Sequence, residues 1–302
     1  MDLPDSILER EPKLKFKLSK YRNRVWIVSL TAIFLSLLGI ILCCLDPSIK
    51  APLRPGLDFT GGTQIQLERI CEKSCSPINT NSISEELSRF SLPKQKDGQV
   101  PNLSLAKIQL LDESRSLVLR LPFLNASQSN KVINQINLIA GPIDLNVTSI
   151  ETIGPSLGLQ LLRSSLASLF VAFLGITLYI TIRYDRQYAL LALLALAHDV
   201  LIVCGIFAWF GLLLKIEVDS LFAVSLLTIA GYSVNDTVVV FDRIREFSRN
   251  NSLLSVNYAE KIDMAVSATL TRTIYTSGTT LLPLIALNLF GGSTLFWFSL
   301  SL

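Results

Sequence analysis

The chain has 302 residues, of which 50% are hydrophobic and 17% charged, and its formal net charge at pH 7 is +3. Its mean hydropathy of +0.48 is too high for an ordinary soluble globular protein. The composition therefore indicates a protein that lies largely within a membrane.

Apolar stretches recur along the chain, and each can cross a bilayer because a helix of about 20 residues spans the hydrocarbon core. They cover residues 25–45, 164–182, 189–214, 220–241 and 264–290. Residues 294–302 are expected to start a truncated sixth spanning helix, since they rise only about 14 Å. The first stretch is predicted to be an uncleaved anchor, because it exceeds the roughly 7 to 15 apolar residues of a signal peptide and no cleavage pattern follows it.

The basic residues predict an orientation. Residues 1–24 contain seven Lys or Arg residues, and the positive-inside rule assigns such a segment to the cytoplasm. Arg183 and Arg186 mark a second inner loop, and residues 242–263 form a third basic segment. The N-terminus is therefore predicted to be cytoplasmic, and residues 46–163 are predicted to form a domain on the outer side.

The outer segment has the pattern of a small α+β domain. Polar and apolar residues alternate, as in half-buried strands, in residues 63–68, 106–110, 116–120 and, more weakly, 146–150. Capping-box spacing at Ser82 and Glu85 predicts a helix through about Phe90, and helical periodicity predicts another over residues 126–139. The resulting order, βαββαβ, is typical of a ferredoxin-like split βαβ sheet with helices on one face.

The cysteines divide into two groups. Cys71 and Cys75 lie in the outer segment, four residues apart. A disulfide between them requires a turn, because an extended chain would hold their Cα atoms too far apart. Cys43, Cys44 and Cys204 lie in apolar stretches, where packing as small apolar side chains is their expected role.

The sequence lacks the signatures of an enzyme. His198 is the only histidine and no second cysteine pair exists, so no metal site is expected. Neither GxxxxGK[ST] nor a strand-linked GxGxxG occurs, and the outer segment has no Ser/His, Cys/His or paired-carboxylate constellation. We therefore expect no catalysis, no cofactor and no nucleic-acid partner.

Two charged residues lie at matching depths in neighbouring apolar stretches. Asp236 is about 8 Å from the cytoplasmic end of its stretch, and Arg272 is a similar distance into the next. A charge at such depth costs roughly 2.5 to 3.5 kcal/mol, and an ion pair would offset much of this cost. The matching depths predict such a pair, as a proton-coupling site or a static packing contact; alternatively, Arg272 extends to the headgroups.

Polar neighbours support the first interpretation. Thr269, Arg272, Thr276 and Thr279 form a polar stripe on one helix face that could border a hydrated path. Asn235 and Thr237 flank Asp236 and are assigned supporting roles, as is Thr276.

Asp199 is a second acid within an apolar stretch, and His198 precedes it. The two could relay protons as weaker members of the coupling site. Static hydrogen bonds offer an alternative, with Asp199 capping polar groups of a neighbouring helix and His198 neutral.

Several motifs follow one another along the chain: Gly56-Leu-Asp-Phe-Thr-Gly-Gly62, Gly154-Pro-Ser-Leu-Gly158, Ala197-His-Asp-Val200, residues 231–246 and Thr271-Arg-Thr-Ile-Tyr-Thr-Ser-Gly278. They span nearly the whole chain. In this order they resemble the SecF family, whose members form the smaller subunit of the SecD–SecF protein-export complex. Gly56, Asp58, Gly61 and Gly62 belong to the first motif, and the glycines either form a hinge or satisfy turn geometry.

The resemblance implies a membrane bundle of the resistance–nodulation–division (RND) class, with six helices and one external domain after the first. The implied partners are SecD and the SecYEG channel, with SecA acting indirectly and unfolded secretory polypeptides as substrate. The proton-motive force would drive late translocation, and the family's proposed proton route matches Asp236 and Arg272. The implied location is the bacterial cytoplasmic (inner) membrane, with a thylakoid membrane as the alternative.

Two other classes of function remain as alternatives for this chain. A small-molecule proton antiporter of the same superfamily would normally have twelve helices and two external domains, about twice what this chain contains. A non-transporting assembly factor of the translocase would need no proton carrier. Because a truncated sixth helix would leave one side of the bundle unpacked, we also expect instability or a dependence on SecD.

Overall fold

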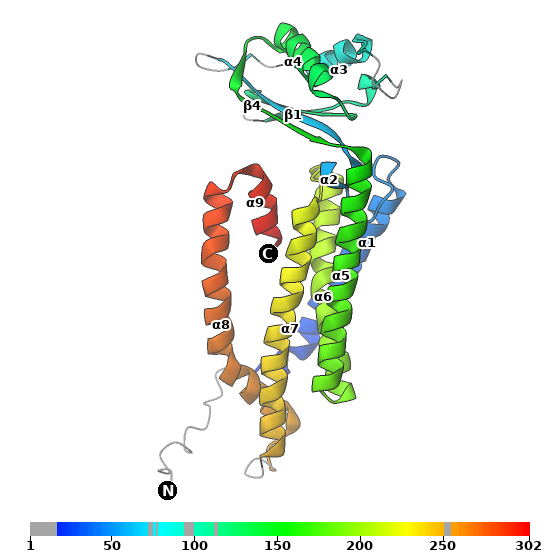
Figure 1. Cartoon of the computed structure of the whole chain (residues 1–302). Coiled ribbons are helices and arrows are strands. Elements are labelled where there is room, and N and C mark those ends of the chain that lie inside the picture. Colours follow the sequence, from blue (N-terminus) through cyan, green and yellow to red (C-terminus); the bar gives the residue numbers. More distant parts are fainter. Residues whose placement is uncertain (1–16, 72–74, 77, 94–99, 112–113, 251–254) are drawn as a thin grey trace, which may run out of the picture. The chain divides into compact units, whose positions relative to one another are not determined.

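The computed structural model describes residues 17–71, 75–76, 78–93, 100–111, 114–250 and 255–302. The chain divides into two compact units. One comprises Pro55–Ser165, and the other combines Met1–Arg54 with Leu166–Leu302. Figure 1 shows that the first contains the sheet and the second the long helices.

The first unit is a four-stranded antiparallel sheet with the strand order β2-β3-β1-β4. Its strands are β1 Gly62–Arg69, β2 Lys107–Leu111, β3 Ser116–Leu121 and β4 Ile143–Ile153. Helices α3 Thr80–Arg89 and α4 Ala126–Ala140 lie on one face of the sheet (Figure 1). Each helix connects two strands that have another strand between them, which confirms the predicted split βαβ topology.

Alternating apolar residues build the core of this unit. Ile65 and Leu67 of β1 and Leu119 of β3 point to the helix-covered face and are fully buried. Ile83 of α3 and Ile136 of α4 are also fully buried and pack in the same cluster. Alternate residues of the strands therefore pack against one face of each helix in a single core.

The predicted start of α3 is wrong. Asn79 is the N-cap, and its side chain accepts a hydrogen bond from the backbone N–H of Asn81. Asn is as good an N-cap as Ser, so the helix begins ahead of Ser82, which lies within it. A capping box does occur at α4, where Asn125 and Gln128 exchange side-chain and backbone hydrogen bonds.

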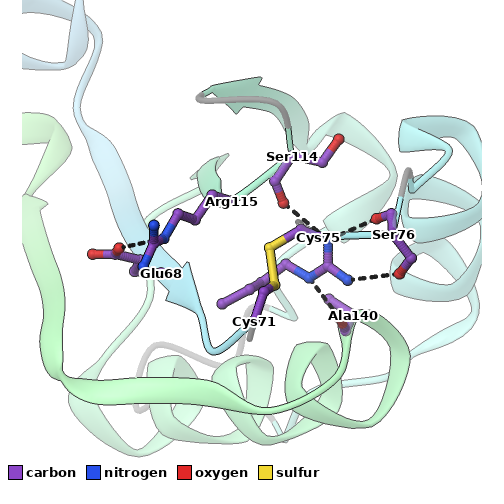
Figure 2. Close-up of a disulfide and its surroundings, with 8 residues drawn as sticks. Glu68, Cys71, Cys75, Ser76, Ser114, Arg115 and Ala140 are labelled. Carbon is purple, nitrogen blue, oxygen red and sulfur yellow. Dashed lines mark hydrogen bonds and ion pairs between the residues drawn. A yellow bond between two sulfur atoms is a disulfide. The ribbon is translucent and has the colours of Figure 1, made fainter. Parts of the chain in front are cut away.

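The disulfide that the spacing allowed is present between Cys71 and Cys75, whose Cα atoms are 5.3 Å apart. Beside it, Arg69 is buried, with 7% of the residue exposed. It donates hydrogen bonds of 2.7 to 2.9 Å to the carbonyl oxygens of Ala140, Ser76 and Ser114 (Figure 2). Arg69 thus joins three loops at one end of the sheet.

The second unit contains helices that are long and apolar enough to cross a membrane, and the structure has five of them. They are α1 Arg22–Leu45, α5 Pro155–Arg183, α6 Arg186–Leu213, α7 Ser220–Arg249 and α8 Tyr258–Phe290. A short helix, α9 Gly292–Ser301, packs against α8 and α7. Large apolar side chains such as Val28, Phe170 and Leu289 are exposed, as expected for surfaces that face lipid.

Small residues bring α1 and α6 close together. Gly205 of α6 lies against Ser36 of α1, so that a Cβ at Gly205 would overlap the Ser36 side chain. One turn further along both helices, Gly39 contacts Trp209, whose indole N–H donates to the Leu35 carbonyl oxygen at 3.0 Å. Close approach through small residues is a common way for helices to associate in lipid.

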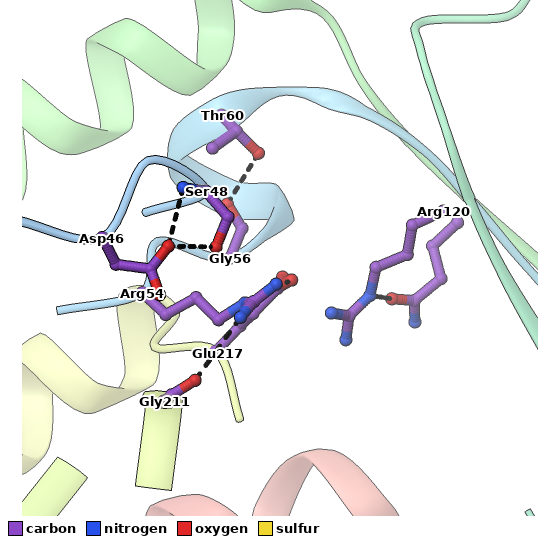
Figure 3. A network of polar contacts seen from close by, with 9 residues as sticks. Asp46, Ser48, Arg54, Gly56, Thr60, Arg120, Gly211 and Glu217 are labelled. Atoms are coloured by element: carbon purple, nitrogen blue, oxygen red, sulfur yellow. Dashed lines mark hydrogen bonds and ion pairs between the residues drawn. The ribbon is translucent and has the colours of Figure 1, made fainter. Parts of the chain in front are cut away.

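The segment that follows α1 is fixed by polar contacts to the loop after α6 (Figure 3). Arg54 lies 3.7 Å from the carboxylate of Glu217, with both side chains almost buried. The Arg54 carbonyl oxygen accepts from the backbone N–H of Val218 at 2.9 Å. Nearby, hydrogen bonds from the Ser48 side chain and backbone to the carboxylate of Asp46 lower its pKa.

Candidate functional site

Asp236 lies on the side of α7 that packs against α8. It precedes Val240 by four residues and Ile244 by eight, a spacing that keeps all three on one side of the helix. Val240 and Ile244 pack with Phe247 and Ala265 in the apolar cluster between α7 and α8. Asp236 therefore continues the α7 face of this cluster by one helical turn.

Arg272 occupies the corresponding place on α8. It follows Ala268 by four residues and Ala265 by seven, so it continues the face that meets α7. Asp236 and Arg272 are each about 6 Å along the helix axis from the last residue of the shared cluster. Because consecutive helices α7 and α8 run in opposite directions, the two charged groups lie at the same level.

The predicted ion pair is not formed in this structure. Among the residues that the structure describes, neither the Asp236 carboxylate nor the Arg272 guanidinium makes an ion pair, and Arg272 is exposed. Beyond the apolar cluster α8 parts from α7 (Figure 1). The sequence predicted that Asp236 and Arg272 lie at the same depth, but it did not predict the separation of their helices.

The supporting residues make only local contacts. The Thr276 hydroxyl donates to carbonyl oxygens of its own helix, those of Arg272 and Thr273, at 3.1 and 2.9 Å. Asn235 is exposed and Thr237 half-buried. None of the hydrogen bonds found for these described side chains links α7 to α8.

His198 and Asp199 lie in a chain of hydrogen bonds that joins three spanning helices. The Ser29 hydroxyl of α1 lies 2.8 Å from Nε2 of His198, and Nδ1 of His198 lies 2.9 Å from Oδ1 of Asp199. The other carboxylate oxygen, Oδ2, accepts from the Ser233 hydroxyl of α7 at 2.7 Å. Ser233 precedes Asp236 by one helical turn.

Sequence reasoning did not identify Ser29 and Ser233 as members of this group. Ser29 is one of several hydroxyl residues in an apolar stretch, and its hydrogen bond with His198 of α6 is what distinguishes it. Ser233 could have been noticed, because it is one turn from Asp236 and in the same motif. Both serines are identified by hydrogen bonds between helices, which the sequence does not show.

The two glycine motifs of the sheet-bearing unit meet. Gly61 and Gly62 have φ angles of +68° and +133°, which other residues rarely adopt. A Cβ at Gly158 would lie 2.9 Å from the backbone nitrogen of Gly61, too close for a side chain. Gly56 is extended, and its carbonyl oxygen accepts from the Thr60 hydroxyl (Figure 3). Asp58 lies in the first turn of α2 Leu57–Thr60, so the motif forms a tight turn.

Charged residues gather at the ends of α5 and α7. Arg183 lies 3.6 Å from Asp242, and burial together with the Asp242 carboxylate raises the pKa of Tyr184 to about 12. An open depression of about 690 Å³ is lined by Arg183, Asp242, Arg245, Glu246, Arg249 and Asn250. In the described part of the chain, no group of three His, Cys, Asp or Glu side chains could hold a metal ion.

Comparisons with known protein families agree with the motifs. Residues 133–302 match the family described as "Protein export membrane protein SecD/SecF, C-terminal". Residues 49–68 match the "SecD/SecF GG Motif". The second match contains the tight turn at Gly61 and Gly62, and the first contains all the charged residues of the candidate site.

Individual relatives extend this similarity over nearly the whole chain. The protein translocase subunit SecF of Prochlorococcus marinus is 54% identical over 96% of this chain and 89% of its own length. SecF of Synechocystis is 40% identical over 96% of this chain and 88% of its own length. These relatives are subunits of a transport system and not enzymes.

A solved structure shares the fold. The crystal structure of SecDF from Thermus thermophilus, described as a translocon-associated membrane protein, superposes with a TM-score of 0.73 and 28% sequence identity. The match covers 96% of this chain and 36% of the SecDF chain, so this chain spans about a third of that longer protein. The chain is therefore a multi-pass membrane protein that belongs to the SecD/SecF family, as a SecF-type subunit of the protein translocase.

Proposed function

We propose that this subunit works with SecD to promote late protein translocation with the energy of the proton-motive force, after SecA has driven polypeptide into the SecYEG channel. The observation that carries this proposal is the position of Asp236 and Arg272 at one level on the facing sides of α7 and α8. An acid and a base at such depth are expensive to keep in lipid unless they have a use.

The proposed cycle exploits the separation of α7 and α8. When Asp236 is ionised, attraction draws it toward Arg272, and the pair offsets the cost of burying both charges. A proton taken up by Asp236 from the outer side removes that attraction, and the helices part. Release of the proton to the cytoplasm restores the attraction. Each proton then moves α8 once relative to α7.

The orientation and the partner are part of the proposal. The basic residues at Lys17, Lys20, Arg22 and Arg24 precede α1, and the positive-inside rule puts this end in the cytoplasm. The sheet-bearing unit Pro55–Ser165 would then lie outside, where it can meet the emerging polypeptide. In the SecDF relative of Thermus thermophilus this chain matches 31% of the length, which leaves room for a SecD portion.

The test replaces Asp236 with Asn in the complex with SecD and measures export into inverted membrane vesicles with and without a proton gradient. Asp236→Asn is expected to abolish the gain that the gradient gives, because an amide cannot take up a proton. The ATP-driven part of translocation and the recovery of the complex with SecD should be retained.

Asp242→Asn is the matched control, since Asp242 is a carboxyl on the same helix that pairs with Arg183 near the helix end. This control should keep the gradient-dependent gain. Normal gradient-driven export by Asp236→Asn would refute the proposal. Loss of the SecD complex in that variant would instead favour an assembly factor.

A further inference from the structure

The chain of hydrogen bonds through Ser29, His198, Asp199 and Ser233 is separate from the Asp236–Arg272 pair. It contains an acid of its own, Asp199, whose charge has to be balanced. Ionised Asp199 beside neutral His198 carries one negative charge. His198 is the partner found for Asp199 among the ion pairs of the described residues. A net charge at this depth costs roughly 2.5 to 3.5 kcal/mol. One added proton makes the two side chains neutral as a pair.

The hydrogen bonds show where that proton would go. While Asp199 is ionised, Nδ1 of His198 must carry hydrogen to donate to Oδ1, and Nε2 accepts from the Ser29 hydroxyl. An added proton binds Nε2, and the Ser29 oxygen then accepts instead of donating. Transfer of the Nδ1 proton to Oδ1 converts Asp199 to the acid. The transfer from Nδ1 to Oδ1 moves a proton along an existing hydrogen bond of 2.9 Å, and the added proton arrives at the nitrogen that the Ser29 hydroxyl already contacts at 2.8 Å.

Ser233 connects this pair with Asp236. Its hydroxyl donates to Oδ2 of Asp199 at 2.7 Å, so Ser233 and Asp199 lie at the same level. Asp236 is three residues further along α7, about 4.5 Å toward the C-terminal end of the helix. In the proposed orientation that end is cytoplasmic. His198 and Asp199 therefore lie on the outer side of Asp236.

Few other titratable groups lie in the helices packed around this pair. On α1 there is none from Val25 to Leu42. The neighbouring stretches of the other helices contribute Tyr179 on α5, Cys204 on α6, and Tyr232 and Asp236 on α7. The side chain of Asp199 keeps 45% of its surface uncovered by this chain, so the carboxyl group is open to a neighbouring molecule at that depth.

We propose that His198 and Asp199 form a second proton-binding site, which receives each proton before Asp236 and passes it on through the Ser233 hydroxyl or water. This inference rests on the proposed function, because the direction of travel is the one given there for Asp236. The site binds one proton: His198 takes it at Nε2 and Asp199 receives the Nδ1 proton at Oδ1. Rotation of the carboxyl group then turns the acid proton toward Ser233 and α7, where it is released. Return of the ring proton from Nε2 to Nδ1 restores the starting state.

The order Ser29, His198, Asp199 also matches the connectivity of a hydrolase triad. In this protein the chain does not end at the aspartate, because Ser233 of another helix binds its second oxygen. Members of the family are components of a transport system. Hydrogen bonds that join three helices suit proton transfer from one helix to the next.

The first test compares two replacements of Asp199 that separate proton carriage from shape. Asp199→Asn keeps the size and can still accept and donate hydrogen bonds, but it cannot hold a proton. Asp199→Glu keeps the acid and lengthens the side chain. The readout is the rate of proton uptake by vesicles that contain the complex with SecD, together with gradient-driven export.

Asp199→Asn is expected to slow proton uptake by about a hundredfold, the low end of what a positioned proton-transfer group contributes. Asp199→Glu should retain more activity than Asp199→Asn. The reverse order would mean that shape alone matters and would overturn the inference. Thr228→Ala is the control on α7, since the Thr228 hydroxyl bonds the Val224 carbonyl oxygen of its own helix.

The second test uses the fact that the chain has one histidine. The full chain, labelled with ¹⁵N in histidine, purified without a histidine tag and placed in lipid bilayers, gives the NMR signals of His198 alone. A hydrogen-bonded Nδ1–H should be present and should be lost in Asp199→Asn. Identical signals in both proteins would overturn the inference.

The two proposals fail in different ways. Unimpaired gradient-driven export by Asp236→Asn removes the proposed function and with it the order of proton transfer. If Asp236→Asn abolishes that export while Asp199→Asn keeps the parent rate of proton uptake, the proposed function stands and His198 and Asp199 are not a proton-binding site.

Discussion

At the scale of single residues, buried polar side chains determine which parts of this protein are rigid. Among the residues that the structure describes, Arg69 makes no ion pair, and its guanidinium donates to three backbone carbonyl oxygens. Tyr184 has a different environment, a buried residue that packs with residues of α5 and α7 and has Asp242 nearby. Each makes a prediction that depends on one functional group.

Replacing Arg69 with Lys should destabilise the sheet-bearing unit by about 2 kcal/mol or more, because one ammonium group cannot reach three carbonyl oxygens and a buried unsatisfied group costs about 1 to 3 kcal/mol. Hydrogen exchange of the full chain in detergent should rise in the peptides around Ser76, Ser114 and Ala140. Arg89→Lys is the control, since Arg89 and Glu85 are largely exposed. Equal exchange in both variants would refute this role for Arg69.

Tyr184 should make the helix packing sensitive to high pH. Its pKa is raised from 10.0 to about 12 by burial and by Asp242. The folded state therefore favours the neutral phenol, so this contribution to stability is complete below pH 10 and is lost as the pH rises toward 12.

Absorbance titration at alkaline pH, compared between the parent chain and Tyr184→Phe, should isolate one phenol that ionises near pH 12. The thermal stability of the parent should fall more steeply than that of Tyr184→Phe over this range. The expectation would be contradicted if the phenol that Tyr184→Phe removes titrated in the parent chain at an ordinary tyrosine pKa.

At the scale of elements, helix contacts depend on small residues at specific places. Gly205→Ala should destabilise the α1–α6 pair by about 1 to 3 kcal/mol, the usual cost of overpacking, because its Cβ would overlap Ser36. Thermal unfolding in detergent measures the effect. Adding Ser36→Gly should recover part of the loss.

Gly175→Ala on α5 is the control for this prediction, since nothing lies within 4 Å of a Cβ at that glycine. The control should be neutral or slightly stabilising, because Ala has the higher helix propensity. A similar loss in both variants would mean that helix propensity, and not contact with α1, decides the outcome.

The elements also show how far a single sequence leads. Period and length were enough for the spanning helices and for the βαββαβ order, because both depend on local hydrophobic pattern. The start of α3 was wrong, since Asn79 and Ser82 are both acceptable caps and only the packed structure selects one. The separation of Asp236 from Arg272, and the contact of Ser29 with His198, depend on how helices lean, which no local pattern encodes.

At the scale of the whole molecule, the sheet-bearing unit and the helical unit each have their own core. Loss of stability in one need not unfold the other, so the Arg69 and Gly205 variants should be distinguishable by which unit loosens. The proposed proton sites lie entirely within the helical unit. Coupling to the polypeptide would therefore require that motion in the helical unit reaches the sheet-bearing unit.

One contact at the start of the helical unit decides how α8 can move. The backbone N–H and hydroxyl of Ser19, just ahead of α1, both donate to the carboxylate of Asp263, at 2.9 and 2.6 Å, and Asp263 is 2% exposed. The first turns of α8 are thus tied to the base of α1. We expect the proposed motion of Arg272 toward Asp236 to leave this end of α8 in place, so that the displacement of α8 grows toward its far end, near Phe290. Asp263 would then lie at the fixed end of α8.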